Sequence, residues 1–203
     1  MKYIFPPRPE NKVPRSSIDT FDDGTFMAQP KFNGSCAELY LDKSFKVMNR
    51  HQQTLSGVTI KEDEFRSIFD FGKENLIVGE YMNKSKKGLD GKIFNHKFMT
   101  FDIIVSDGTH LLGKTFSERY DMLYEKFKIL DEDELTYKLS DNIYLVKNYE
   151  KDFGKIWDNI TKIDMIEGLV LKKKNAGLEL GTREKNNWAN QIKIRKTEKN
   201  YSY

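Results

Sequence analysis

Apolar and polar residues alternate along much of the chain with the two-residue period of half-buried strands. The alternation is interrupted by residues typical of tight turns, at Gly34 and at positions 42–43. Ser106, Asp107 and Gly108 have the composition of a hairpin turn. We therefore expect strands at residues 26–31, 36–41, 45–50, 76–81, 98–105, 168–171 and 191–195.

Three segments instead show the 3.6-residue period of amphipathic helices. Thr59 and Glu62 have the spacing of a capping box before the first of them, and Thr115 and Glu118 have it before the second. The expected buried faces are Phe65, Ile68 and Phe69; Tyr120, Leu123, Phe127 and Leu130; and Phe153, Ile156, Trp157 and Ile160.

Many strands broken by few helices favour the α+β class over a doubly wound parallel sheet. We expect antiparallel β-sheets flanked by helices, within one domain at residues 26–203. The proline-rich residues 1–25 are expected to form an extended N-terminal arm.

Composition narrows the class of protein further. A single cysteine excludes a disulfide framework and a cysteine-rich zinc site. No apolar run is long enough for a membrane span or a secretory signal, so we expect a cytoplasmic monomer with no membrane partner. The net charge of +3 hides an asymmetry, because residues 165–203 carry nine basic and four acidic groups. Such a basic segment favours a polyanionic partner, although a solvated lysine-rich tail would have the same composition.

A lysine at the end of the first strand, Lys31, is followed by the turn residues Asn33 and Gly34. A lysine amine attacks an electrophile only when it is uncharged, because an ammonium has no lone pair. Neighbouring cations favour the uncharged form. Taken alone, the same pattern also describes an exposed lysine beside a hairpin.

Three other clusters place charged residues beside apolar strands. Glu80 closes one strand, Phe101 and Asp102 lie within another, and Glu167 precedes a third. Lys193 and Arg195 are two residues apart in the last expected strand, so their side chains share one face. Two adjacent cations repel each other unless an anion lies between them, although charges also protect the edge strand of a sheet.

In this order, the clusters resemble the covalent nucleotidyltransferase superfamily, which comprises ATP-dependent DNA ligases, RNA ligases and mRNA capping enzymes. The sequence Lys-Phe-Asn-Gly at residues 31–34 is similar to the nucleophile motif of that superfamily. The resemblance implies roles for Lys31 as the nucleophile, Arg50 in the next motif, Glu80 at the ribose, Phe101 on the purine, Glu167 at the metal, and Lys193 and Arg195 at the α-phosphate.

The resemblance implies a ligase-type adenylation domain that uses ATP with Mg²⁺ or Mn²⁺. Lys31 would form a lysyl-AMP adduct, and the adenylate would pass to a 5′-phosphate before a 3′-hydroxyl seals the strand. Glu167 is the first expected metal ligand and Glu80 the second. The implied partner is nicked duplex DNA or RNA, and the lysines expected to contact it are Lys84, Lys86, Lys87 and Lys92.

Two departures from the superfamily pattern affect the expected substrate. Cys36 stands where DNA ligases and capping enzymes usually have an arginine, and its presence favours RNA or a relaxed substrate preference. Gln29 stands where DNA ligases often have a glutamate, and its amide can bond to either adenine or guanine.

The chain ends eight residues after Arg195, so we expect no OB-fold module.

The leading interpretation is a minimal, phage-like or virus-like ligase that seals nicks in DNA. An RNA ligase is the first alternative. The third interpretation is either an mRNA-capping-type guanylyltransferase or a non-catalytic nucleic-acid-binding module.

Overall fold

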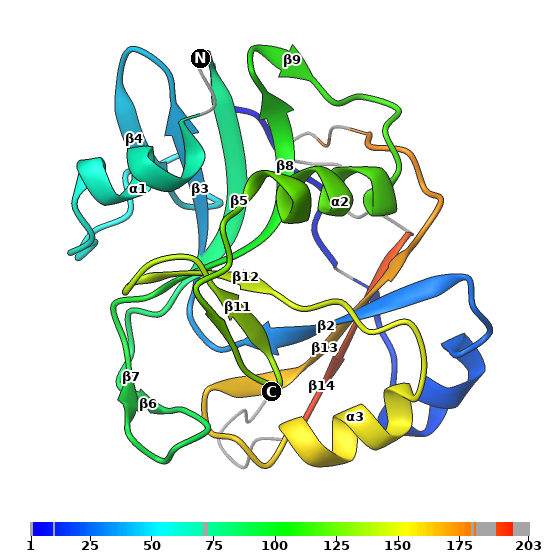
Figure 1. The fold of residues 1–203 in the computed structure, drawn as a ribbon. Helices are drawn as coiled ribbons and strands as arrows, with labels where there is room; N and C mark the ends of the chain where they lie inside the picture. Colours follow the sequence, from blue (N-terminus) through cyan, green and yellow to red (C-terminus); the bar gives the residue numbers. More distant parts are fainter. Residues whose placement is uncertain (1, 10, 71–72, 180, 182–189, 197–203) are drawn as a thin grey trace.

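The computed structural model describes residues 2–9, 11–70, 73–179, 181 and 190–196, and its strands form two main sheets (Figure 1). The larger sheet contains, in spatial order, β10 (Asp131–Glu132), β11 (Thr136–Lys138), β12 (Ile143–Val146), β8 (Phe98–Ser106), β5 (Asn75–Tyr81), β3 (Ser35–Leu41) and β4 (Phe45–Met48), with β9 (Thr109–His110) paired to β8. The smaller sheet has the order β1 (Asn11–Lys12), β14 (Gln191–Arg195), β13 (Ile166–Lys173) and β2 (Phe26–Phe32).

A short hairpin and four helices complete the described architecture. The hairpin pairs β6 (Lys86–Lys87) with β7 (Ile93–Phe94). The helices are the 3₁₀ helix η1 (Arg15–Phe21) and the α-helices α1 (Glu62–Phe69), α2 (Phe116–Lys126) and α3 (Phe153–Ile160). None of the described helices has the length and apolar character that crossing a membrane requires. The expected α+β class with mainly antiparallel pairing is confirmed, although β1 with β14 and β12 with β8 are parallel pairs.

The helix starts were predicted with mixed success. The capping box before α2 is confirmed, because Glu118 N donates to Thr115 Oγ1 at 3.2 Å and Thr115 N donates to Glu118 Oε2 at 2.7 Å. The capping box before α1 is wrong, because the residue at the N-cap is Lys61 and the Thr59 hydroxyl instead lies 3.1 Å from the hydroxyl of Tyr81.

The predicted apolar face of the second helix extends too far. Helix α2 ends at Lys126, and Phe127 is its C-terminal cap. Leu130 lies beyond the helix and is 56% exposed, so it is not part of the core.

Each sheet has its own core. The large sheet packs against α1 and α2, with Phe65 and Phe69 of α1 against Phe98 of β8. One face of the small sheet packs against α3 and η1. Trp157 of α3 and Ile18 of η1 are among the buried side chains of this core. The N-terminal residues touch both sheets, because Tyr3 and Ile4 bond to the large one while β1 pairs with β14 of the small one. A domain boundary at residue 25 stays a prediction.

The chain passes from one sheet to the other at Gly34. Strand β2 belongs to the small sheet and β3 to the large one, and only the turn at residues 33–34 separates them. A Cβ at Gly34 would overlap the carbonyl oxygen of Tyr81, so a glycine is needed for this close crossing. The end of β2 is thereby held against the end of β5.

Strand β13 lies between β2 and β14, and one of its glycines aligns three strands. Gly168 is opposite Lys31 on one side and opposite Arg195 on the other. The register shifts between Ile166 and Gly168, which leaves Glu167 in a β-bulge. Gly168 has a φ of 151°, and a Cβ there would overlap the Ile194 carbonyl. The bulge and the close strand approach therefore both depend on this glycine.

We predict that Gly168→Ala lowers the free energy of unfolding by at least about 3 kcal/mol, because it combines backbone strain with a clash against main-chain atoms. Urea denaturation measures the change. Gly24→Ala is the matched control, since Gly24 has a φ of 83° but no other atom lies within 4 Å of the space that its Cβ would occupy. The control should cost about 1 kcal/mol. Equal losses for the two variants would contradict the role given to the close approach.

Candidate functional site

Three charged side chains from the three aligned strands meet beside the bulge. Glu167 forms an ion pair with Lys31 through Oε1 and another with Arg195 through Oε2. The Glu167 side chain is only 8% exposed, whereas Lys31 is 22% and Arg195 is 34% exposed. The carboxylate therefore separates and neutralises two cations that would otherwise repel each other, while both cations remain partly exposed.

A second carboxylate, that of Glu80, lies at the end of β5 next to this group. Gly34 N donates to Glu80 Oε1 at 3.0 Å, which fixes the carboxylate against the turn after Lys31. Burial raises the pKa of Glu80 from its ordinary value of 4.5 to about 7, although the nearby positive charge of Lys31 opposes the rise. The charge of Glu167 adds to the rise, so the two carboxylates are electrostatically coupled.

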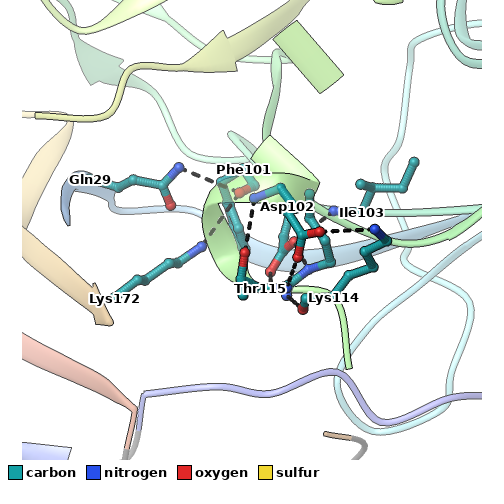
Figure 2. A network of polar contacts seen from close by, with 9 residues as sticks. Gln29, Phe101, Asp102, Ile103, Lys114, Thr115 and Lys172 are labelled. Atoms are coloured by element: carbon teal, nitrogen blue, oxygen red, sulfur yellow. Dashed lines mark hydrogen bonds and ion pairs between the residues drawn. The ribbon is translucent and has the colours of Figure 1, made fainter. Parts of the chain in front are cut away.

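Two side chains from the small sheet form hydrogen bonds with the main chain of Phe101 (Figure 2). Gln29 Nε2 and Lys172 Nζ each donate to the Phe101 carbonyl at 3.4 Å. The ammonium of Lys172 also lies 4.7 Å from the centre of the Phe101 ring and 4.5 Å from that of Phe116. These contacts hold Phe101 between the two sheets, with a cation against its ring.

The Lys172 side chain is almost completely buried, because the residue is only 3% exposed. Burial lowers its pKa to about 8, and the carboxylate of Asp102 opposes that shift. Asp102 itself receives two hydrogen bonds of 2.8 Å from the buried guanidinium of Arg119. Burial by itself would raise the pKa of Asp102, but Arg119, the nearby charge of Lys172 and the Ile103 N–H together lower it, so the carboxylate remains charged beneath Phe101.

A shallow hollow of about 450 Å³ opens beside the ion group. It is lined by residues from the N-terminal arm, from the segment after β4 and from β14, namely Arg8, Pro9, Arg50, His51 and Lys193. Arg50 Nε donates to His51 Nε2 at 3.2 Å, which orients the guanidinium. Three cations in one hollow provide a site for phosphate groups.

The structure thus brings most of the predicted residues close together, and we refer to this region, together with the hollow, as the cleft. Glu167 contacts Lys31 and Arg195, Glu80 lies beside them, and Arg50 and Lys193 line the hollow. Gln29 contacts Phe101, and it is level with Lys193 across β13 because both residues are opposite Val170.

The predicted nucleic-acid lysines lie apart from this group, on and around the β6–β7 hairpin. Lys84, Lys87 and Lys92 are exposed, and Lys92 pairs with Asp90 at 3.3 Å. Lys86 is less exposed and pairs with Asp164 at 3.5 Å. The hairpin is tethered to the turn before β13, because Met165 N donates to Lys87 O at 3.1 Å.

The chain also matches the family model described as ATP dependent DNA ligase domain, over residues 11–193. The chain belongs to this family. The predicted resemblance to the ATP-dependent DNA ligases is therefore confirmed, and so is the predicted ligase-type fold.

Individual relatives agree with this assignment. The ligase domain is 25% identical over 193 residues to the SPbeta prophage-derived DNA ligase-like protein LigB of Bacillus subtilis (strain 168), and the match covers 89% of this chain and 66% of that protein. Its fold is similar to that of a mycobacterial DNA ligase D complexed with ATP and MES, with a TM-score of 0.64, 14% identity, and coverage of 96% of this chain and 62% of that one. It is also similar to the ATP-dependent DNA ligase from bacteriophage T7 in complex with ATP, with a TM-score of 0.53, 11% identity, and coverage of 91% and 68%. The ligase domain spans slightly less than two thirds of the first two of these chains.

Two residues of the cleft were not predicted from the ligase-domain sequence. Arg8 lies in the proline-rich arm, where nothing in the local pattern indicates that the arm reaches the cleft. Lys172 ends the segment Glu-Gly-Leu-Val-Leu-Lys at residues 167–172, which carries part of the family resemblance, but no role was predicted for it. In both cases tertiary contacts set the role of the residue, and the sequence pattern does not show those contacts.

The cleft offers few carboxylates as ligands for a divalent cation. Among the residues that the structure describes, no group of three or more His, Cys, Asp or Glu side chains is arranged to hold a metal ion. Glu80 and Glu167 supply two carboxylates, which suits Mg²⁺ because this ion keeps several waters and takes oxygen ligands from phosphates. The ligase domain therefore fits a metal that binds together with a nucleotide.

We predict that Glu80→Gln makes the ligase domain more stable than the wild type at pH 8 but not at pH 4. The folded-state pKa of Glu80 is about 7 and its ordinary value is 4.5, so the unfolded chain ionises first and the wild type loses stability as the pH rises through that interval. The difference in the free energy of unfolding at pH 8 should be roughly 3 kcal/mol.

Urea denaturation at both pH values measures this difference, and Glu125→Gln on the exposed face of α2 is the surface control. A Glu80→Gln difference that does not change with pH would show that the carboxylate is not held in the environment described.

Proposed function

We propose that this ligase domain transfers AMP from ATP to Lys31 and then to a 5′-phosphate end of a polynucleotide. The observation that carries the proposal is the alignment of Lys31, Glu167 and Arg195 around the bulge of β13, in a chain of the ATP-dependent DNA ligase domain family. This arrangement supports a lysine nucleophile for two reasons. The carboxylate of Glu167 contacts the amine and can act as its base, and the cation of Arg195 lies on the other side of that carboxylate.

In the proposed first step, Lys31 Nζ forms a bond to the α-phosphorus of ATP. The bond between that phosphorus and the bridging oxygen of the β-phosphate breaks, and pyrophosphate leaves with the electron pair. Glu167 Oε1, which contacts Lys31 Nζ, is placed to accept the proton that the amine loses. The product is a lysyl-AMP phosphoramidate.

The remaining residues of the cleft would bind and orient the nucleotide. We assign the purine to Phe101 and Gln29, and the ribose to Glu80. The phosphates are assigned to Arg195, Lys193, Arg50 and the newly found Arg8, because phosphoryl transfer depends mainly on charge neutralisation and alignment. A bound Mg²⁺ or Mn²⁺ would supply further neutralisation of phosphate charge next to Glu167 and Glu80.

In the later steps the adenylate passes to a 5′-phosphate, and a 3′-hydroxyl attacks that phosphate and releases AMP. We propose nicked duplex DNA as the substrate because the family model and the bacteriophage relative are DNA ligases. Cys36 keeps an RNA ligase as the second candidate. It lies opposite Glu80 in the pairing of β3 with β5, and it has no positive charge to offer a phosphate.

We predict that the wild type acquires label from α-labelled ATP and that Lys31→Arg does not, with a loss of at least about 10³-fold. The arginine keeps a positive charge beside Glu167 but cannot act as a nucleophile at neutral pH. Denaturing electrophoresis detects the acid-labile adduct. Labelling of Lys31→Arg at the wild-type rate would refute the assignment of the nucleophile, and a wild type that never acquires label would refute the proposed reaction.

We also predict that the β6–β7 hairpin contributes phosphate contacts. Replacing Lys84, Lys87 and Lys92 together with alanine should reduce the slope of log K against log[salt] for nicked DNA by about 2 to 3. Fluorescence anisotropy with nicked DNA and nicked RNA measures the slope and also compares the two substrates. The matched control replaces the exposed lysines Lys43, Lys46 and Lys128. Equal slopes for the two triple variants would place the nucleic acid elsewhere.

A further inference from the structure

Asn148 has a buried side-chain amide whose hydrogen-bonding groups are both unused. Among the residues that the structure describes, neither its Oδ1 nor its Nδ2 has a hydrogen-bond partner, and both atoms are inaccessible to solvent. Within the same described ranges, only Thr100 Oγ1 and Asp107 Oδ1 share this condition. A buried amide without partners is costly, and such a group is usually retained for a reason other than stability.

The main chain around Asn148 is firmly held. Tyr149 and Ala28 exchange two hydrogen bonds of 2.9 Å, so the segment is bridged to β2. From the other side, the Tyr120 hydroxyl of α2 donates to Val146 O at 2.9 Å and is hydrogen-bonded to the backbone of Asn148. The amide is therefore presented from a fixed backbone and not from a mobile loop.

The bridge also determines what lies beside Asn148. Ala28 and Tyr149 form an isolated antiparallel bridge, and the residues next to it are Gln29 on one side and Asn148 on the other, so these two are neighbours across the bridge. Ala28 and Tyr149 face the core of the small sheet, so alternation directs the next pair to the opposite face. Gln29 shares that face with Lys31, two residues along the same strand.

The same segment follows β12, which runs parallel to β8 with Leu145 opposite Thr100. Residue 146 therefore leaves the sheet beside Phe101, and the chain crosses β2 on its way to α3 (Figure 1). The segment that carries Asn148 thus runs next to both the strand that carries Phe101 and the strand that carries Gln29.

We propose that Asn148 contacts the edge of the purine bound on Phe101, next to Gln29, and contributes to the choice of base. This inference rests on the proposed function, in which the cleft binds ATP. A carboxamide presents one donor and one acceptor side by side, which matches the amino group and a ring nitrogen of adenine. Both polar atoms are closed to solvent in this structure, so the Asn148 side chain turns toward the purine to make the hydrogen bonds that the protein leaves unmade.

The test compares Asn148→Leu with Asn142→Leu. Asn142 is the matched control because its side-chain amide is already used, with Nδ2 donating to Glu64 Oε2 at 3.0 Å and Oδ1 accepting from Lys97 Nζ at 2.8 Å. Affinity for ATP is measured by titration calorimetry in a Lys31→Arg background, which removes turnover, and stability is measured by urea denaturation.

Asn148→Leu should weaken ATP binding by about 10-fold while its stability is equal to or greater than that of the wild type, because leucine removes two unsatisfied buried groups. Asn142→Leu should lose stability and bind ATP normally. Asn148→Asp should raise the ratio of GTP affinity to ATP affinity by about 10-fold, because a carboxylate accepts from the two neighbouring donors of guanine but cannot donate to adenine.

Unchanged ATP affinity and base preference in both Asn148 variants would overturn the inference. Normal ATP binding by the Lys31→Arg protein, together with no labelling of the wild type, would overturn the proposed reaction but not the base contact. A chain that binds neither ATP nor GTP would overturn both.

Discussion

The cleft depends on one carboxylate, that of Glu167, placed between the cations of Lys31 and Arg195. The three residues come from strands far apart in the chain, and without the carboxylate the two cations would face each other across β13. The bulge places that carboxylate, because it removes Glu167 from the regular alternation of the strand. Gly168 then permits β14 to approach closely enough for Arg195 to reach it.

A second ionic group lies next to Phe101. Asp102 and Arg119 pair almost completely out of solvent, and Lys172 lies against the rings of Phe101 and Phe116. A buried pair of this kind adds little net stability compared with apolar packing, but losing one partner leaves an uncompensated charge. Its structural effect here is to fix α2 against β8 beside Phe101. The Phe101 carbonyl accepts hydrogen bonds from Gln29 and Lys172 of the small sheet, so both sheets hold this residue.

The sequence was sufficient for local features but not for long-range ones. Strands such as β5 and β8 were predicted because their apolar runs are bounded by turn residues, and α3 because its apolar residues recur with helical spacing. Strands β11 and β12 were missed because the acidic residues before them resemble a loop. The Thr59 capping box was wrong because the hydroxyl of Tyr81, which is 22 residues away in the chain, competes for the threonine.

The candidate site was also predicted in its local parts only. Lys31 and Glu167 were selected from short patterns, yet they are 136 residues apart and no pattern predicts that they touch. Arg8 has no local signal at all, because tertiary contacts place it in the hollow.

The ion group also constrains how a nucleotide can enter. In the structure Glu167 uses both of its oxygens, one on Lys31 and one on Arg195, so the amine already has an anionic partner. If Lys31 is the nucleophile, this contact must weaken before the amine can attack. An incoming phosphate would compete with Glu167 for Arg195, and the carboxylate released on that side becomes a better acceptor for the lysine proton. The same anion that is attacked would then activate its attacker, which ties deprotonation of Lys31 to occupation of the phosphate site.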